Sequence, residues 1–169
     1  MPYGMSRSER SKVWMAYIAM DPSDAKLVYV GSQRIWRTRD AGTHWAPISP
    51  VFDYSTVTVI EPAAADGRVI YVGTENGGVF RSRDGGETWS SIVASAALPA
   101  YSITRIESNP RDARQVYACV ANFGHSLQEI IVLHVGVAVV VVFHLRLNSR
   151  DNRGSDPTAE IELSEHARP

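Results

Sequence analysis

Two aspartates, Asp40 and Asp84, are the residues whose type and spacing could support acid–base chemistry. They occupy the same place in two similar eight-residue segments, 38–45 and 82–89. Glycoside hydrolysis normally uses two carboxylates about 5 to 9.5 Å apart, one on either side of the bond that is cleaved. A catalytic pair is therefore one hypothesis for these aspartates, and a structural role in two equivalent turns is the other.

The residues around Asp84 favour the structural role. Its carboxylate can accept hydrogen bonds from backbone N–H groups of the turn that follows, and Gly86 permits the positive φ of a tight turn. The hydroxyls of Ser82 and Thr88 can bridge the two flanking strands, and Trp89 can pack its ring into the core. We therefore expect this segment to clamp a turn.

The first segment differs from the second mainly at His44, which stands where the second has a threonine. Because imidazole can donate or accept a hydrogen bond, we expect this turn to keep its geometry. Four residues of the first segment have equivalents of the same kind in the second: Thr38, Asp40, Gly42 and Trp45.

Both segments belong to a longer internal repeat. Residues 26–31 return as 68–73 and, more weakly, as 114–119, with offsets of about 42 and 46 residues. Each unit has short runs of β-branched or aromatic residues separated by Gly, Asp, Asn or Pro, which is typical of consecutive antiparallel strands. Four such strands in about 40 to 50 residues make one blade of a β-propeller.

On these motifs the chain resembles the BNR, or Asp-box, family of propeller repeats, whose pattern is Ser/Thr-x-Asp-x-Gly-x-Thr-Trp. Residues 82–89 match the pattern at every fixed position. The family occurs in sialidases, endo-xyloglucanases, sortilin-type receptors and photosystem assembly factors. In those proteins the Asp-box turns lie at the periphery and reactions occur at the central face. The resemblance thus implies that Asp40 and Asp84 are structural, and no catalytic residue is predicted.

The expected fold is an all-β partial β-propeller of about two and a half four-stranded antiparallel blades with Asp-box hairpins. The blades are expected at about 11–50, 54–95 and 100–126, the last one incomplete, after an N-terminal tail of residues 1–10. A closed propeller needs about four to eight blades. We therefore expect a fragment whose exposed strand edges favour self-association.

The C-terminal third departs from the repeat, because no further Asp-box follows residue 126. Residues 127–147 form an apolar, Val-rich segment for which buried strands are the favoured interpretation. A membrane-associated or interfacial helix at 130–145 is the alternative, although that run is shorter than a membrane span. Residues 148–169 are expected to be disordered. The abrupt change suggests a frameshift, a gene fusion or a truncated reading frame.

The remaining acidic and aromatic residues are the other candidates for a site. Four acidic residues are expected on the solvated surface: Asp53, Glu61, Glu75 and Glu107. Three aromatic residues of the inter-blade loops could stack on sugar or peptide, with packing between blades as the favoured interpretation: Phe52, Tyr54 and Tyr101. A sialidase would need a Phe/Tyr-Arg-Ile-Pro segment, and none is present.

Composition excludes several classes of partner. Lys plus Arg number 17 and Asp plus Glu 18, for a net charge of −1, so no nucleic-acid partner is expected. The single cysteine, Cys119, excludes an internal disulfide and is expected to be a small buried residue. No spacing predicts a metal site or a cofactor. The apolar run 13–20 lacks a cleavage site, so we expect a strand and, by default, a cytoplasmic location, although the resembling family is often secreted.

Two functions remain as hypotheses. The first is a non-catalytic BNR propeller fragment whose parent domain binds a glycan or a protein. The second is a fragment of a BNR glycoside hydrolase, of endo-xyloglucanase or sialidase type, whose catalytic residues lie in missing blades.

Overall fold

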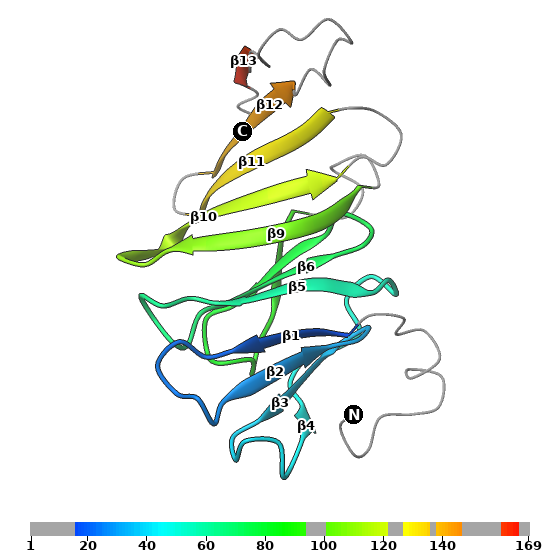
Figure 1. The fold of residues 1–169 in the computed structure, drawn as a ribbon, viewed down its shortest axis with the longest axis vertical. Coiled ribbons are helices and arrows are strands. Elements are labelled where there is room, and N and C mark those ends of the chain that lie inside the picture. Colours follow the sequence, from blue (N-terminus) through cyan, green and yellow to red (C-terminus); the bar gives the residue numbers. More distant parts are fainter. Residues whose placement is uncertain (1–15, 94–100, 122–126, 136–137, 147–159, 166–169) are drawn as a thin grey trace, which may run out of the picture.

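The computed structural model of the chain describes residues 16–93, 101–121, 127–135, 138–146 and 160–165. Every regular element among them is a β-strand, and the strands form three antiparallel sheets that follow one another along the chain (Figure 1). The expected all-β architecture of successive antiparallel blades is therefore confirmed. Within the described residues, no helix is long and apolar enough to cross a membrane.

The first two sheets are four-stranded meanders in which each strand pairs with its neighbours in sequence. The first contains β1 (Tyr17–Met20), β2 (Val28–Gly31), β3 (Ile35–Thr38) and β4 (Ala46–Pro47). The second contains β5 (Val57–Pro62), β6 (Ile70–Thr74), β7 (Val79–Ser82) and β8 (Ser90–Val93). Short turns join the strands, as the repeated Gly, Asp and Pro residues predict.

The third sheet is larger than the sequence predicts. Its order is β13-β12-β11-β10-β9, with β9 (Ser102–Asn109), β10 (Asp112–Ala121), β11 (Leu127–Val135), β12 (Ala138–Arg146) and β13 (Glu160–Glu165). Only the first two of these strands were expected in an incomplete blade. The Val-rich segment supplies β11 and β12, because β-branched residues suit extended backbone and β10 offers an edge for pairing.

Within the tail that was expected to be disordered, Glu160–Glu165 pair with β12 as β13. An unpaired sheet edge accepts another strand through backbone hydrogen bonds, even one of polar sequence. The rest of 148–169 lies outside the described residues, as do the N-terminal tail 1–10 and the beginning of the expected strand at 13–20.

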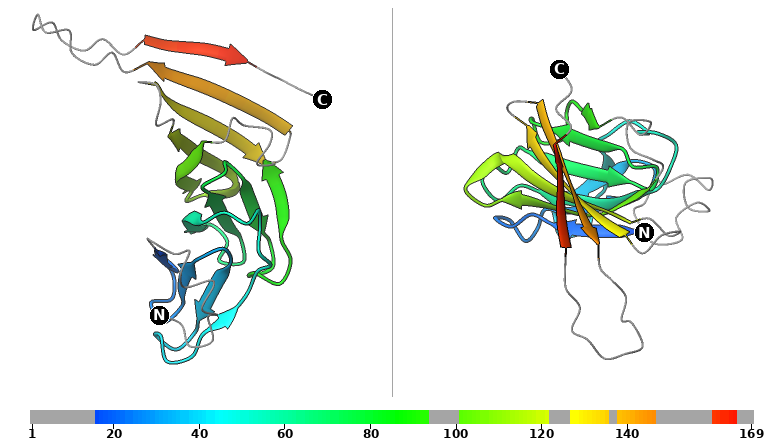
Figure 2. Two further views of the ribbon diagram at one scale, coloured as in Figure 1. Left: turned by 90° about the vertical axis from the view of Figure 1, so that its right-hand side faces the viewer. Right: turned by 90° about the horizontal axis from the view of Figure 1, so that it is seen from above.

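The buried side chains lie between consecutive sheets. β1 contacts β5, and β5 contacts β9, so that the first strands of the three sheets run side by side (Figures 1 and 2). One cluster joins the first two sheets and includes Tyr29, Val57 and Ile70. Another joins the second and third sheets and includes Tyr71 and Ile103. Each blade therefore completes its core only against its neighbour, as expected for a radial repeat.

Two repeated glycines allow this close approach. A Cβ atom on Gly31 would lie 2.7 Å from Cγ1 of Val57, and one on Gly73 would lie 2.5 Å from Cγ2 of Ile103. The third repeat has Cys119 at this position. Cys119 is half-buried rather than buried as expected, because the alternation along β10 turns its even-numbered neighbours, such as Ala118, toward the core.

Candidate functional site

The second turn (residues 82–89) joins β7 to β8 and is held together by its own polar side chains. Ser82 Oγ donates to Asp84 Oδ1 at 2.8 Å and accepts the Gly86 N–H at 2.8 Å. Thr88 donates its N–H to Asp84 Oδ1 at 2.9 Å and its hydroxyl to Asp84 Oδ2. The Ser82 and Thr88 hydroxyls therefore both converge on one carboxylate instead of bridging the two strands directly.

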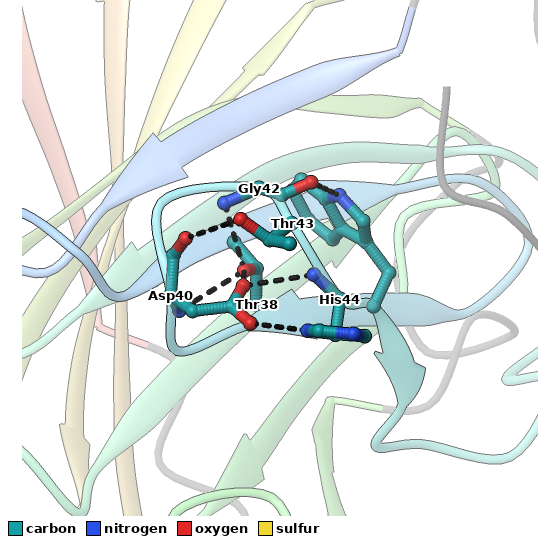
Figure 3. A network of polar contacts seen from close by, with 6 residues as sticks. Thr38, Asp40, Gly42, Thr43 and His44 are labelled. Atoms are coloured by element: carbon teal, nitrogen blue, oxygen red, sulfur yellow. Dashed lines mark hydrogen bonds and ion pairs between the residues drawn. The ribbon is translucent and has the colours of Figure 1, made fainter.

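The first turn (residues 38–45) joins β3 to β4 with the same arrangement (Figure 3). Thr38 Oγ1 donates to Asp40 Oδ1 at 2.8 Å and accepts the Gly42 N–H at 2.9 Å. His44 donates its N–H to Asp40 Oδ1 at 2.8 Å, and its Nδ1 lies 2.6 Å from Asp40 Oδ2. The imidazole thus occupies the place of the Thr88 hydroxyl.

The hydrogen bonds keep both carboxylates ionised. The Thr88 hydroxyl, followed by the Thr88 N–H and Ser82, lowers the pKa of Asp84 to about 2. The N–H and the imidazole of His44, followed by Thr38, hold the pKa of Asp40 far below its usual range. A general acid in a glycosidase needs the opposite shift, a pKa raised toward neutrality. Neither aspartate is suited to donate a proton at neutral pH.

The second turn also contacts the preceding sheet. Trp89 Nε1 donates to the carbonyl of Ile48 at 2.7 Å and to that of Gly86 at 3.1 Å. Arg37, on β3, donates to the Gly85 carbonyl. The bonds to Ile48 and from Arg37 cross between the first and second sheets. This turn therefore couples two blades as well as closing its own hairpin.

The two turns share a left-handed backbone conformation at one position but place different residues there. Ala41 has a φ of 56°, whereas the corresponding residue of the second turn, Gly85, has a φ of 72°. A left-handed conformation is costly for alanine but not for glycine. We expect Ala41→Gly to raise the free energy of unfolding by about 0.5–1 kcal/mol, because the left-handed strain that it relieves exceeds the conformational entropy that glycine gains in the unfolded chain. Urea denaturation would measure this, and Gly85→Ala should shift stability in the opposite direction.

Acid should weaken the second turn. Since folding lowers the pKa of Asp84 to about 2, from roughly 3.9 in an unfolded chain, the stabilisation it provides is complete above that unfolded value and is lost as pH falls toward 2. We expect Asp84→Asn to be less stable than the parent at pH 7 and to lose less stability between pH 4 and pH 2. Urea denaturation at several pH values would show this, and parallel losses in both proteins would contradict it.

The three aromatic candidates lie in different surroundings. The ring of Phe52 stacks on Phe80 with centroids 4.5 Å apart and meets Trp89 edge-on at 5.2 Å. Tyr101 is half-buried against the cluster between the second and third sheets. Tyr54 is 81% exposed. Phe52 and Tyr101 therefore take part in packing, and Tyr54 is the aromatic of this group that is open to a ligand.

Two of the four acidic candidates are engaged rather than solvated, which corrects the expectation for them. Asp53 Oδ2 accepts the Thr74 hydroxyl at 2.6 Å. Glu61 Oε1 accepts the N–H and hydroxyl of Ser108 at 3.1 and 2.8 Å. Burial raises the pKa of Glu61, and the two bonds from Ser108 oppose that rise. Both carboxylates join segments distant in sequence, which explains why sequence alone suggested no partner.

The other two acidic candidates lie at the surface. Glu107 forms an ion pair with Arg105, and Glu75 is exposed. Within the described ranges, no group of His, Cys, Asp and Glu side chains is arranged to hold a metal ion.

A groove of about 500 Å³, which the sequence did not predict, lies between the second and third sheets. Its lining includes five arginines, Arg68, Arg81, Arg83, Arg111 and Arg114, together with Asp66 and Asp112. The residues come from three separate segments, and a net charge of −1 conceals their local excess. The repetition of Asp-x-Arg at 66–68 and 112–114 was the available signal.

Comparison with known proteins gives similarity to a xyloglucanase in sequence and to solved structures in fold. No family model matches the sequence. The chain is 26% identical over 118 aligned residues to the xyloglucanase Xgh74A of Acetivibrio thermocellus, covering 54% of this chain and 14% of that protein. It therefore spans only a small part of the length of this relative.

Solved structures extend the similarity to the fold. The GH74 xyloglucanase from Xanthomonas campestris superposes with a TM-score of 0.54 at 15% identity, covering 88% of this chain and 28% of that one. YCF48 from Cyanidioschyzon merolae gives a TM-score of 0.32 at 9% identity, over 88% of this chain and 71% of that one. Together with the successive antiparallel sheets, the similarity to the GH74 structure shows that the chain forms part of a β-propeller.

Proposed function

We propose that this chain supplies blades to a glycan-binding propeller of the xyloglucanase type, and that it performs no hydrolysis itself. In this proposal the two turns are Asp-box turns, and Asp40 and Asp84 stabilise hairpins. The proposal rests mainly on the commitment of both carboxylates to hydrogen bonds within their own turns. A catalytic carboxylate must instead reach a substrate or a water molecule.

The relatives suggest the ligand class. Xgh74A and the Xanthomonas protein are both xyloglucanases by name, which favours a β-glucan such as xyloglucan over a sialylated ligand. If the parent protein hydrolyses its ligand, we propose that the catalytic carboxylates lie outside this chain, since the chain covers 14% of Xgh74A. A protein ligand is the alternative for a non-catalytic propeller.

The proposal is tested with the full chain by affinity electrophoresis in gels that contain xyloglucan, together with an assay for new reducing ends. Retarded migration without new reducing ends is the expected result, and sialyllactose should not compete. Absence of retardation would contradict glycan binding. Any release of reducing ends would contradict the non-catalytic assignment, and its loss in the Asp40→Asn/Asp84→Asn variant would also contradict the structural role of the two aspartates.

Tyr54 provides a sharper test of glycan binding. Because its ring is 81% exposed, it is available to stack on a sugar face. We expect Tyr54→Ala to weaken retention by xyloglucan several-fold without lowering the melting temperature. Phe52→Leu serves as the comparison, because Phe52 is engaged in packing with Phe80 and Trp89 and should affect stability rather than retention.

A further inference from the structure

The groove between the second and third sheets has an excess of positive charge. Asp66 accepts Nε and Nη2 of Arg68 at 3.2 and 3.1 Å. Asp112 accepts the same atoms of Arg114 at 3.0 and 2.9 Å. Each aspartate thus has a bidentate partner two residues further along. With five arginines against two aspartates in the lining, the formal charge remains strongly positive.

The equivalent position between the first and second sheets shows which groups an arginine at the place of Arg81 can bind. There Arg37, the counterpart of Arg81 in the repeat, donates to the carbonyl of Gly85 in the neighbouring turn. Glu87 of the same turn is close enough to interact electrostatically with Arg37. The neighbouring blade therefore supplies carbonyl and carboxylate oxygens to the guanidinium.

The third sheet lacks an equivalent turn in its described part, where β10 pairs with the long strand β11 and β11 pairs with β12 instead. Arg81 and Arg83 consequently line an open groove. The Nε of Arg81 is buried and has no hydrogen-bond acceptor among the described residues. A buried donor without an acceptor is costly, so the hydrogen-bonding capacity of the Arg81 guanidinium is not fully used by the described residues.

The floor of the groove is held in place. Tyr71 is fully buried, and its hydroxyl donates to the carbonyl of Ala113 at 2.6 Å across the two sheets. Arg81 lies close enough to Tyr71 to interact electrostatically with it. Because these contacts restrict Arg81, its guanidinium is preorganised to receive a ligand.

We propose that this groove binds a ligand bearing an oxyanion group, a carboxylate, phosphate or sulfate, at Arg81, Arg83 and Arg111. A guanidinium group can donate hydrogen bonds to two oxygens of such a group at once and can pair with their negative charge. A neutral sugar offers no such charged pair of oxygens. A volume of about 500 Å³ lies within the range of small-molecule sites. The site is independent of the proposed function, because xyloglucan is a neutral polymer.

Titration calorimetry at constant ionic strength tests the proposal on the full chain. The probes are inorganic sulfate, inorganic phosphate and glucuronate, with glucose as the neutral comparison. We expect saturable binding of at least one oxyanion and none of glucose. Preference for glucuronate would identify an acidic sugar, and preference for phosphate or sulfate would identify an esterified ligand.

Matched variants locate the site. Arg83→Ala and Arg111→Ala should each weaken binding by about tenfold, since each removes one charge-assisted contact. Arg39→Ala, the equivalent change in the first turn and outside the groove, should leave binding unchanged. Circular dichroism melts establish that the variants fold. Absence of saturable oxyanion binding, or an equal loss with Arg39→Ala, would overturn the proposal. Xyloglucan retention should be unaffected by all three changes.

Discussion

Gly73→Ala is expected to lower the free energy of unfolding by about 2–3 kcal/mol, although it adds only one methyl group. The new Cβ would lie 2.5 Å from Cγ2 and 2.7 Å from Cβ of Ile103, and 2.7 Å from Cγ1 of Val59. Both neighbours are buried and belong to β9 and β5. Because neither is the far end of a flexible side chain, the strands themselves must separate.

Urea denaturation followed by circular dichroism would measure the effect. Gly67→Ala is the matched control, because the nearest atom to its Cβ is Asp21 Oδ2 at 3.9 Å. We expect that control to change stability by no more than about 0.5 kcal/mol. Similar losses in the two variants would show that the cost comes from glycine replacement in general and not from the contact between the second and third sheets.

The position of Gly31 and Gly73 in the repeat could be predicted from the sequence only in part. The repeat containing Gly31 and Gly73 was evident from the sequence, and with it the strands of the first two blades. That these glycines face the next blade was not evident, because the contact joins residues on different sheets. The substitution of Cys119 at the third position gains meaning only from that contact.

The turns were predictable because their information is local. Each hydrogen bond within residues 38–45 or 82–89 joins residues at most four positions apart. Such bonds depend on residue type and spacing, which a sequence displays directly. The bond between the Trp89 indole and the Ile48 carbonyl spans 41 positions and could not be read in the same way.

The C-terminal strands were the least predictable part of the fold. An apolar run without alternation fits a buried strand or a helix, so residues 127–147 left both interpretations open. Pairing with β10 is decided by the free edge of the third sheet, a property of the fold. The arginine groove is likewise a property of the fold, because Arg83 follows β7 and Arg111 precedes β10, and the two line one groove only when the second and third sheets pack together.

Trp89→Ala is expected to lower the free energy of unfolding by about 3 kcal/mol, because it removes both packing and hydrogen bonds. The ring packs against the cluster between the first two sheets and lies edge-on to Phe52. Its indole N–H donates to Ile48 and Gly86. Trp89→Phe keeps most of the packing and loses those bonds, so we expect a smaller loss of about 1 kcal/mol.

The equivalent residue of the first turn separates the two roles of Trp89. Trp45 donates its indole N–H to Gly42 within its own turn at 3.0 Å and packs against Val30 and Trp36 of its own sheet. Trp45→Ala should therefore cost less than half as much as Trp89→Ala in urea denaturation. Equal losses would mean that hairpin closure accounts for both effects. A larger loss at Trp89 would instead measure the coupling between blades, because that contact distinguishes the two tryptophans.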